Sequence, residues 1–204
     1  MLHIETVEPF TLGLLKQLMI DEDLNQFVLV GGTALALQMG NRQSIDLDLF
    51  TIQDFVSEDL KSNLISKYND FQVTIQTPQT LLCNINDIKV DFIRFKYPFI
   101  RPLLEVDGIR MLSIEDIAAM KLDAIAGRGS KKDFFDLYFI LKKYSLETIL
   151  EFYKEKYPHQ TLFHIVRSLA YFADADLQPD PIVFDKKTTW SKVKKALSKE
   201  IQKI

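Results

Sequence analysis

Two aspartates separated by a single residue, Asp46 and Asp48, are the side chains of this sequence best suited to chemistry. They alternate with aliphatic residues, so in a β-strand both carboxylates face the same side of the sheet. Two like charges side by side repel each other and lower the stability of the strand. A divalent cation would offset this repulsion, because Mg²⁺ is commonly held by one or two carboxylates together with substrate phosphates. The alternative is a solvated face of an edge strand.

A glycine turn upstream of the aspartates is a candidate phosphate site. The apolar run 27–30 predicts a short buried strand, and Gly31 and Gly32 are followed by Thr33–Met39, which favours a helix. Such a turn directs backbone N–H groups and the positive end of a helix dipole toward one point. We expect the two glycines to let the backbone approach phosphates, with Thr33 as a further donor. A tight turn of purely structural importance is the alternative, but turn and carboxylates together suit phosphoryl or nucleotidyl transfer.

A third carboxylate, Asp91, lies at the centre of the apolar strand predicted for 88–95. A buried aspartate without a partner is costly there. It could pair with Lys89 or an arginine, or it could face Asp46 and Asp48 if the two strands are neighbours. The spacing does not decide between these roles.

Arg42 and Ser44 shortly precede the carboxylate pair. The planar fork of a guanidinium suits phosphate, because it can donate two parallel hydrogen bonds. We therefore expect Arg42 and Ser44 to contact a triphosphate. Alternatively, Arg42 could form a surface salt bridge and Ser44 could be a cap.

The remaining pattern predicts a mixed α/β half followed by a helical half. Strands are expected at residues 44–51, 71–76, 81–85 and 88–95, the last two forming a hairpin through Asn86-Asp87. Helices are expected at residues 8–20, from Ser57, from Ser113 (with a capping box variant to Asp116), from Ser130 to about Tyr144, and at about 146–156, 160–173 and 190–203. An extended connector is expected between the last two helices. We predict an α+β fold with an α/β core at 1–110 and a helical domain at 111–204.

Composition excludes several classes of protein. The formal net charge of −3 gives no overall basic field for nucleic acid, and the single Cys83 excludes an internal disulfide. No signal peptide and no apolar run of membrane-spanning length is visible. We expect a soluble, cytoplasmic protein without a membrane partner.

These residues resemble the nucleotidyltransferase superfamily related to DNA polymerase β. Its pattern is a diglycine or Gly-Ser, a spacer of about ten residues, Asp-x-Asp in a strand, and a third carboxylate on a later strand. Here the pattern is Gly31-Gly32, Asp46-Leu47-Asp48 and Asp91. More narrowly, GGTALALQ, NRQSIDLDLF and KLDAIAGRGSKKDFFDLYFIL resemble the AbiEii/AbiGii-type nucleotidyltransferases, toxins of type IV toxin–antitoxin and phage-defence systems. The resemblance covers roughly residues 25 to 145 and implies a nucleotidyltransferase-type mixed sheet with flanking helices.

The resemblance also implies roles for individual residues. Asp46, Asp48 and Asp91 would hold one or two Mg²⁺ ions, and Asp91 would help to deprotonate the acceptor hydroxyl. Lys121 would reach back to the nucleotide phosphates, although most helix lysines are simply solvated. Asp136 would belong to the nucleotide site.

Two aspartates of the KDFFDL segment keep alternative interpretations. Asp133 could be a helix cap. Asp136 could be an ion-pair partner of Arg128 or Lys132 instead of a site residue. The sequence favours neither reading of Asp136.

The sequence thus predicts a Mg²⁺-dependent enzyme that transfers an NMP from an NTP to an acceptor hydroxyl and releases pyrophosphate. By resemblance the acceptor is a tRNA end or a protein, and a cognate antitoxin is a partner. One rival is an enzyme that adenylylates an aminoglycoside or lincosamide antibiotic; another is an idle nucleotide-binding or antitoxin-like module. The lysines near the C-terminus favour a solvated helix face over a contact with tRNA.

Overall fold

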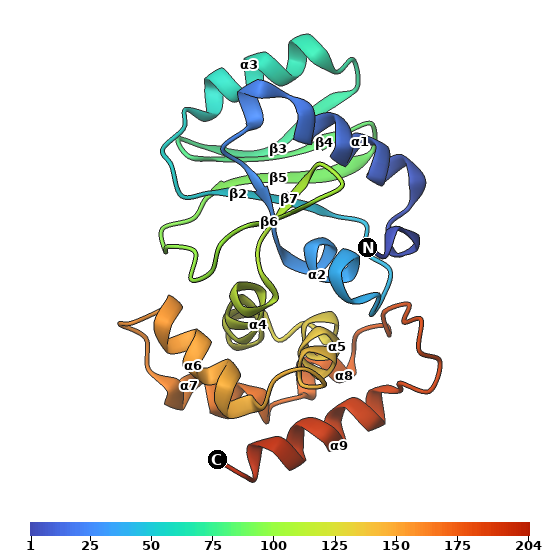
Figure 1. Ribbon diagram of the computed structural model, residues 1–204, viewed down its shortest axis with the longest axis vertical. Helices are drawn as coiled ribbons and strands as arrows, with labels where there is room; N and C mark the ends of the chain where they lie inside the picture. Colours follow the sequence, from blue (N-terminus) through green and yellow to red (C-terminus); the bar gives the residue numbers. More distant parts are fainter.

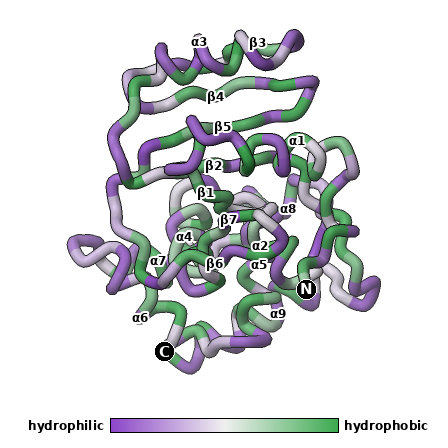
Figure 2. The backbone as a smooth tube through the Cα atoms, turned by 45° about the horizontal axis from the view of Figure 1, so that its top comes forward, coloured by the Kyte–Doolittle hydropathy of each residue, from purple (hydrophilic) through white to green (hydrophobic).

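A seven-stranded mixed sheet forms the centre of the computed structural model, which describes residues 1–204. The strands are β1 (Val28–Leu29), β2 (Leu47–Thr51), β3 (Phe71–Thr77), β4 (Thr80–Ile85), β5 (Ile88–Arg94), β6 (Leu104–Val106) and β7 (Ile109–Met111). Their order across the sheet is β3-β4-β5-β2-β1-β7-β6, which can be followed from top to bottom in Figure 2. The pairs β2–β5 and β1–β7 are parallel and the others are antiparallel.

Helices cover both faces of this sheet. They are α1 (Pro9–Ile20), α2 (Gly31–Met39), α3 (Ser57–Lys67), α4 (Ile114–Arg128), α5 (Lys131–Ile140), α6 (Leu146–Lys156), α7 (Leu162–Leu169), α8 (Ala173–Asp176) and α9 (Trp190–Ile201), with 3₁₀ turns at Ile4–Thr6 and Glu22–Leu24. In Figure 1, α1 and α3 lie above the sheet, whereas α2 and the helices from α4 onward lie below it. The predicted α+β class is confirmed.

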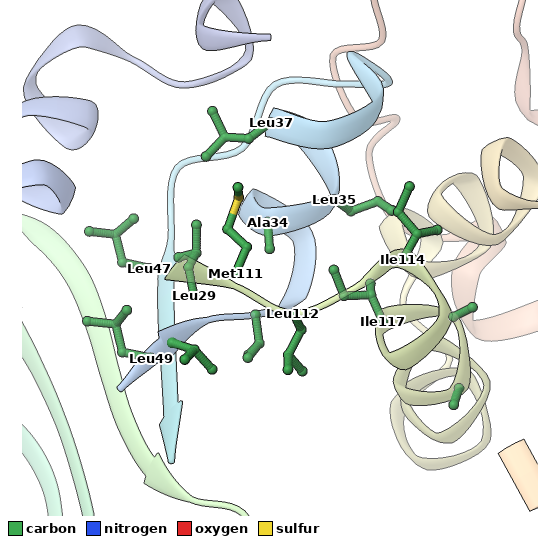
Figure 3. Close-up of a cluster of buried hydrophobic side chains, with 14 of the residues drawn as sticks. Leu29, Ala34, Leu35, Leu37, Leu47, Leu49, Met111, Leu112, Ile114 and Ile117 are labelled. Atoms are coloured by element: carbon green, nitrogen blue, oxygen red, sulfur yellow. The ribbon is translucent and has the colours of Figure 1, made fainter. Parts of the chain in front are cut away.

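One hydrophobic core joins the strand-containing part to the helical part. Figure 3 shows Leu29 of β1, Ala34 and Leu35 of α2 and Ile117 of α4 gathered around Leu112, and all five side chains are fully buried. Burial of apolar surface contributes roughly 25 cal/mol per Å², so this cluster fixes α2 and α4 firmly against the sheet. Because 50 buried residues from Leu2 to Leu197 form one continuous cluster, the division into two domains at residue 110 stays a prediction.

One strand prediction needs correction, and one hairpin was missed. The strand predicted for 44–51 begins only at Leu47, because Ser44 makes an isolated bridge to Val7 and leaves the ladder. The hairpin of β6 and β7 was not predicted. Its Asp107-Gly108 turn has φ of 53° and 75° at the two positions, which is the dipeptide typical of a tight hairpin.

The helical predictions agree better with the structure, because each rests on a local pattern. Ser113 accepts a hydrogen bond from the Asp116 N–H and caps α4 as expected. The helix predicted to reach Tyr144 ends at Ile140, and the segment between the last two predicted helices, expected to be extended, contains the short helix α8.

Candidate active site

Asp48 and Asp91 lie directly opposite each other on the neighbouring parallel strands β2 and β5. Side chains paired in this way share one face of the sheet and lie close together. Burial, followed by the charge of Asp91, raises the pKa of Asp48 above its ordinary value, and Asp46 adds to this effect. Asp46 immediately precedes β2. The sheet therefore meets the condition under which Asp91 could act with the other two aspartates.

Asp91 also has the ion pair that the sequence offered as its alternative role. Lys89 Nζ lies 2.8 Å from Asp91 Oδ2, and the strand register also sets Asp91 opposite Asp48. The role of Asp91 as a third carboxylate of the site stays a prediction. The other oxygen, Oδ1, is buried and has no hydrogen-bond partner. A buried acceptor without a donor is costly, on the order of 1–3 kcal/mol, and is expected where a ligand completes the site.

The carboxylates fit a hard cation in their chemistry but do not form a closed cage. Oxygen ligands suit Mg²⁺, the charge repulsion at Asp48 would be relieved by a cation, and Asp91 Oδ1 is free to bind one. The chain contains no group of three or more acidic, histidine or cysteine side chains that could hold a metal ion. Asp46 instead lies 3.5 Å from Lys132 Nζ. A metal here would need oxygen ligands from substrate as well.

Glycine is required at positions 31 and 32 because other side chains of the site pack directly against their backbone. Gly31 has φ of 68°, in the left-handed region, and a Cβ added there would overlap Asp48 Oδ2. A Cβ on Gly32 would overlap the guanidinium of Arg42 and lie 3.4 Å from Ser44 Oγ. The first turn of α2, whose N–H groups have no partner within the helix, is thereby held against Asp48. The turn thus places a concentration of donors beside the carboxylates.

Thr33 ties the first turn of α2 to the segment before β2. Its side chain is buried, and its hydroxyl contacts the Asp46 carbonyl and lies 2.9 Å from Ser44 Oγ. The hydroxyl is therefore occupied within the protein, which leaves the Thr33 N–H as the group that could contact a phosphate. The predicted contacts of Thr33 and Ser44 with a triphosphate stay predictions.

Arg42 is anchored in the helical part of the molecule. Its Nε and Nη2 donate to the two oxygens of Asp136 at 2.8 and 2.9 Å, and Asn41 donates to the same carboxylate at 2.8 Å. Burial raises the pKa of Asp136, but the charges of Lys121 and Arg42 outweigh it, and the pKa lies below its ordinary value. This carboxylate remains ionised and fixes the orientation of Arg42 behind Gly32.

Lys121 joins this pair to a second one. Its ammonium lies 2.6 Å from Asp136 Oδ2 and 2.8 Å from Asp133 Oδ1, and Asp133 also binds Arg128 through Nε at 2.8 Å. Asp133 is thus an ion-pair centre, and the structure shows no capping bond from the N-cap Ser130. Arg42, Lys121 and Arg128 therefore share only two carboxylates, those of Asp133 and Asp136. One positive charge remains in excess beside Asp48.

The ion-pair alternative proposed for Asp136 needs a correction, because its partners are Arg42 and Lys121 and not Arg128 or Lys132. Asp136 has no exposed surface and both of its oxygens are occupied, so this arrangement favours a positioning role. Its contact with a nucleotide stays a prediction, as does that of Lys121, whose side chain is only 5% exposed.

Two cavities adjoin the carboxylates. One of about 170 Å³ lies between β2 and α4 and is lined by Gly31, Asp48, Lys121 and Arg128 among others. The other, of about 450 Å³, lies beside Asp46 and is bounded by Ser44, Lys132 and residues 178–182; we call it the groove. A third cavity, of about 400 Å³ between α6 and α9, contains none of the predicted site residues.

The wall of the groove was not predicted from the sequence. It is part of the connector, residues 177–189, which joins α8 to α9. The Gln178 side chain accepts a hydrogen bond from the Lys131 N–H at 2.9 Å, and the Ile182 carbonyl accepts one from the Gln43 N–H at 2.8 Å. These partners are far apart in the sequence, so no local pattern indicates them. The sequence indicated Lys132 only as a member of the KDFFDL segment and as a possible partner of Asp136.

The candidate site thus combines a helix N-terminus, the cations Lys121 and Arg128, and aspartates on adjacent strands. A family model described as "Nucleotidyl transferase AbiEii toxin, Type IV TA system" matches residues 13–105 and 55–202. The chain therefore belongs to this family of nucleotidyltransferases. It is also 35% identical over 183 residues to an uncharacterized protein of Aquifex aeolicus (strain VF5), covering 87% of each chain.

Solved structures share the fold. JHP933 from Helicobacter pylori has a TM-score of 0.58 at 20% identity, covering 96% of this chain and 92% of its own. MenT4, a nucleotidyltransferase toxin from Mycobacterium tuberculosis H37Rv, has a TM-score of 0.56 at 16% identity, with 95% and 83% covered. ANT(2")-Ia, solved with adenylyl-2"-tobramycin, has a TM-score of 0.52 at 17% identity, with 71% and 94% covered. None of the helices has the length and apolar character needed to cross a bilayer.

Proposed function

We propose that this nucleotidyltransferase transfers an NMP from an NTP to an acceptor hydroxyl in a Mg²⁺-dependent reaction. The observation that carries the proposal is the register of β2 and β5, which sets Asp91, with its unpaired Oδ1, opposite Asp48, whose Oδ2 lies against Gly31 of the diglycine turn. The acceptor oxygen forms a bond to the α-phosphorus while the bond to the bridging oxygen of pyrophosphate breaks. The proton of the acceptor passes to Asp91 Oδ1 and then to solvent.

The chain's own residues would bind and orient the triphosphate. The N–H groups at the start of α2 donate to phosphate oxygens, and Lys132, whose side chain is partly exposed beside Asp46, supplies a cation in the groove. Arg128 and Lys121 supply positive charge from the other side of Asp48. Asp46, Asp48 and Asp91 would hold one or two Mg²⁺ ions. When bound, Mg²⁺ neutralises charge that develops on the phosphates.

The acceptor that we propose is an RNA end or a protein side chain, and the biological role is that of a toxin with a cognate antitoxin. The family description supports the toxin role. The fold likeness to the toxin MenT4 extends over 95% of this chain, whereas that to the antibiotic-modifying ANT(2")-Ia covers 71%. Antibiotic nucleotidylation is therefore our second candidate.

The test is a labelling experiment with the purified chain. Each α-labelled NTP is incubated with Mg²⁺ and, in separate reactions, with total tRNA, cell protein and a panel of aminoglycosides and lincosamides. We expect label on RNA or protein with the wild type, none with Asp48→Asn or Asp91→Asn, and wild-type labelling with Asp59→Asn, an exposed carboxylate on α3. Label on an antibiotic alone would favour the second candidate. Full labelling by Asp48→Asn would refute the proposed role of the carboxylates.

A further inference from the structure

The charge of this chain is strongly segregated along its length. The last 19 residues, 186–204, contain seven lysines and one glutamate, although the whole chain has three more acidic than basic residues. Residues 1–185 therefore carry nine more acidic than basic side chains. An acidic body with one basic end is a sequence feature of chains that contact an anionic partner through that end.

Three of these lysines form a single stripe on the outer face of α9. Lys192, Lys195 and Lys199 are exposed and follow one another at spacings of three and four residues, so they lie within about 60° of helix circumference. None has an acidic partner within 4.0 Å, whereas Lys194 is paired with Asp176 at 2.8 Å. We call these three residues the lysine stripe. None of the three is held in an ion pair, although the charge of Lys192 is one of the causes that lower the pKa of Asp185.

The opposite face of α9 limits what the lysine stripe can bind. Val193 and Leu197 are fully buried, and Trp190 packs on Phe134 and Phe135, so no apolar face remains for insertion into a bilayer. Lysine is also depleted from the cores of protein–protein interfaces, which are built on aromatic and apolar anchors. A row of unpaired lysines on the exposed face of α9 matches instead a backbone of phosphates.

The connector links the lysine stripe to the groove beside Asp46. From the end of α8 the connector first passes α2, where its residues 182–184 run along residues 41–43. It then reaches the start of α9, as can be followed in Figure 1. Lys186 and Lys187 on the connector are exposed and have no acidic partner. Its two aspartates are already neutralised, Asp180 by Lys131 at 3.0 Å and Asp185 by Lys142 at 3.8 Å. Unpaired cations thus continue from α9 toward the groove.

We infer that the lysine stripe and the connector lysines are a docking surface for the phosphate backbone of an RNA, whose end would enter the groove. This inference rests on the proposed function, because it names the class of acceptor for the same site. The exposed Phe184 lies between the groove and Lys186, where an aromatic ring could stack on an unpaired base. We assign the docking surface to RNA. The experiment below distinguishes RNA from DNA and from acidic protein as the bound partner.

The experiment measures binding of fluorescent tRNA, and of a short single-stranded RNA, without any NTP. The variant is Lys192→Gln/Lys195→Gln/Lys199→Gln, since glutamine keeps helix propensity and removes charge. Its affinity at low salt should fall at least about tenfold. The slope of log affinity against log salt should become shallower by about 2, since each phosphate contact on a single strand contributes about 0.7.

A matched control carries the same charge change elsewhere. Lys16→Gln/Lys96→Gln/Lys143→Gln removes three exposed lysines that have no acidic partner and lie outside α9 and the connector. It should bind RNA as the wild type does, with an unchanged salt slope. Circular dichroism of both triple variants shows whether they are folded.

Four results would overturn the inference: equal RNA affinity in the two triple variants, no RNA binding by the wild type, tighter binding of DNA of the same sequence, or equally good competition by polyglutamate. Asp59→Asn should bind RNA normally, because this exposed carboxylate on α3 lies outside both the docking surface and the site. If RNA binding depends on the lysine stripe but label is transferred to neither RNA nor protein, the docking surface stands and the proposed reaction fails.

Discussion

The two site glycines and a helical glycine elsewhere should respond in opposite directions to alanine. Gly31 has φ of 68°, and holding an L-residue in the left-handed region costs roughly 1–2 kcal/mol. The added Cβ would overlap Asp48 Oδ2, which must rotate away. Because that oxygen is the end of a side chain, we expect Gly31→Ala to lower the free energy of unfolding by about 2 kcal/mol. Displacement of Asp48 should also abolish nucleotidyl transfer.

Gly32→Ala acts through a different contact. Its backbone is helical, so alanine by itself should gain about 1 kcal/mol in helix propensity. The Cβ would, however, overlap Arg42 Nη2, which donates to Asp136 in a buried pair. Separating such a pair costs roughly 3–5 kcal/mol, so the net loss should be about 2–4 kcal/mol.

Gly13 in α1 is the control, because a Cβ there meets nothing within 4 Å. Gly13→Ala should raise the free energy of unfolding by about 0.5–1 kcal/mol. Urea titrations followed by circular dichroism measure all three variants. If Gly31→Ala or Gly32→Ala proved as stable as Gly13→Ala, the close approach of Asp48 and Arg42 to the diglycine would be wrong.

Two further predictions concern charge. Asp136→Asn should lower the free energy of unfolding by about 3–5 kcal/mol, because Arg42 and Lys121 would lose a buried partner; a loss below about 1 kcal/mol in urea titrations would contradict the network. Asp48→Asn should stabilise the metal-free chain near pH 7, because the folded-state pKa of Asp48 is raised and its ionisation therefore destabilises the fold as pH rises above 3.8. The gain should vanish below that pH. Added Mg²⁺ should raise the melting temperature of the wild type and not of this variant, and equal rises in both would argue against Asp48 as a ligand.

Local features could be predicted because they depend on neighbours in sequence. The cap of α4 at Ser113, the turn at Asn86-Asp87 and the alternating burial along β2 all follow from short patterns. That Asp46, which precedes β2, shares a face with Asp48 stays a prediction. The missed β6–β7 hairpin had such a signal in Asp107-Gly108, but its strands have only three residues each, too short for a period-two pattern to stand out.

Contacts between distant residues could not be predicted in the same way. Arg42 and Asp136 are 94 residues apart, and either the arginine or the aspartate alone is compatible with a solvated surface position. Only the packing of α5 against α2 excludes water from both and makes each the obligatory partner of the other. The connector beside Asp46 is likewise fixed by hydrogen bonds to residues more than a hundred positions earlier in the chain.

The sequence by itself determined the groups that we propose to carry the chemistry: a diglycine before a helix, two aspartates at alternate positions and a third on a later strand. Those choices rest on backbone geometry and on side-chain alternation, which act over a few residues. The tertiary structure alone decided that β5 lies next to β2, so that Asp91 meets Asp48 and not only Lys89. It also decided that Lys121 and Arg42 are held by buried aspartates. Strand order and buried ion pairs depend on which distant surfaces exclude water together, and no local pattern records that.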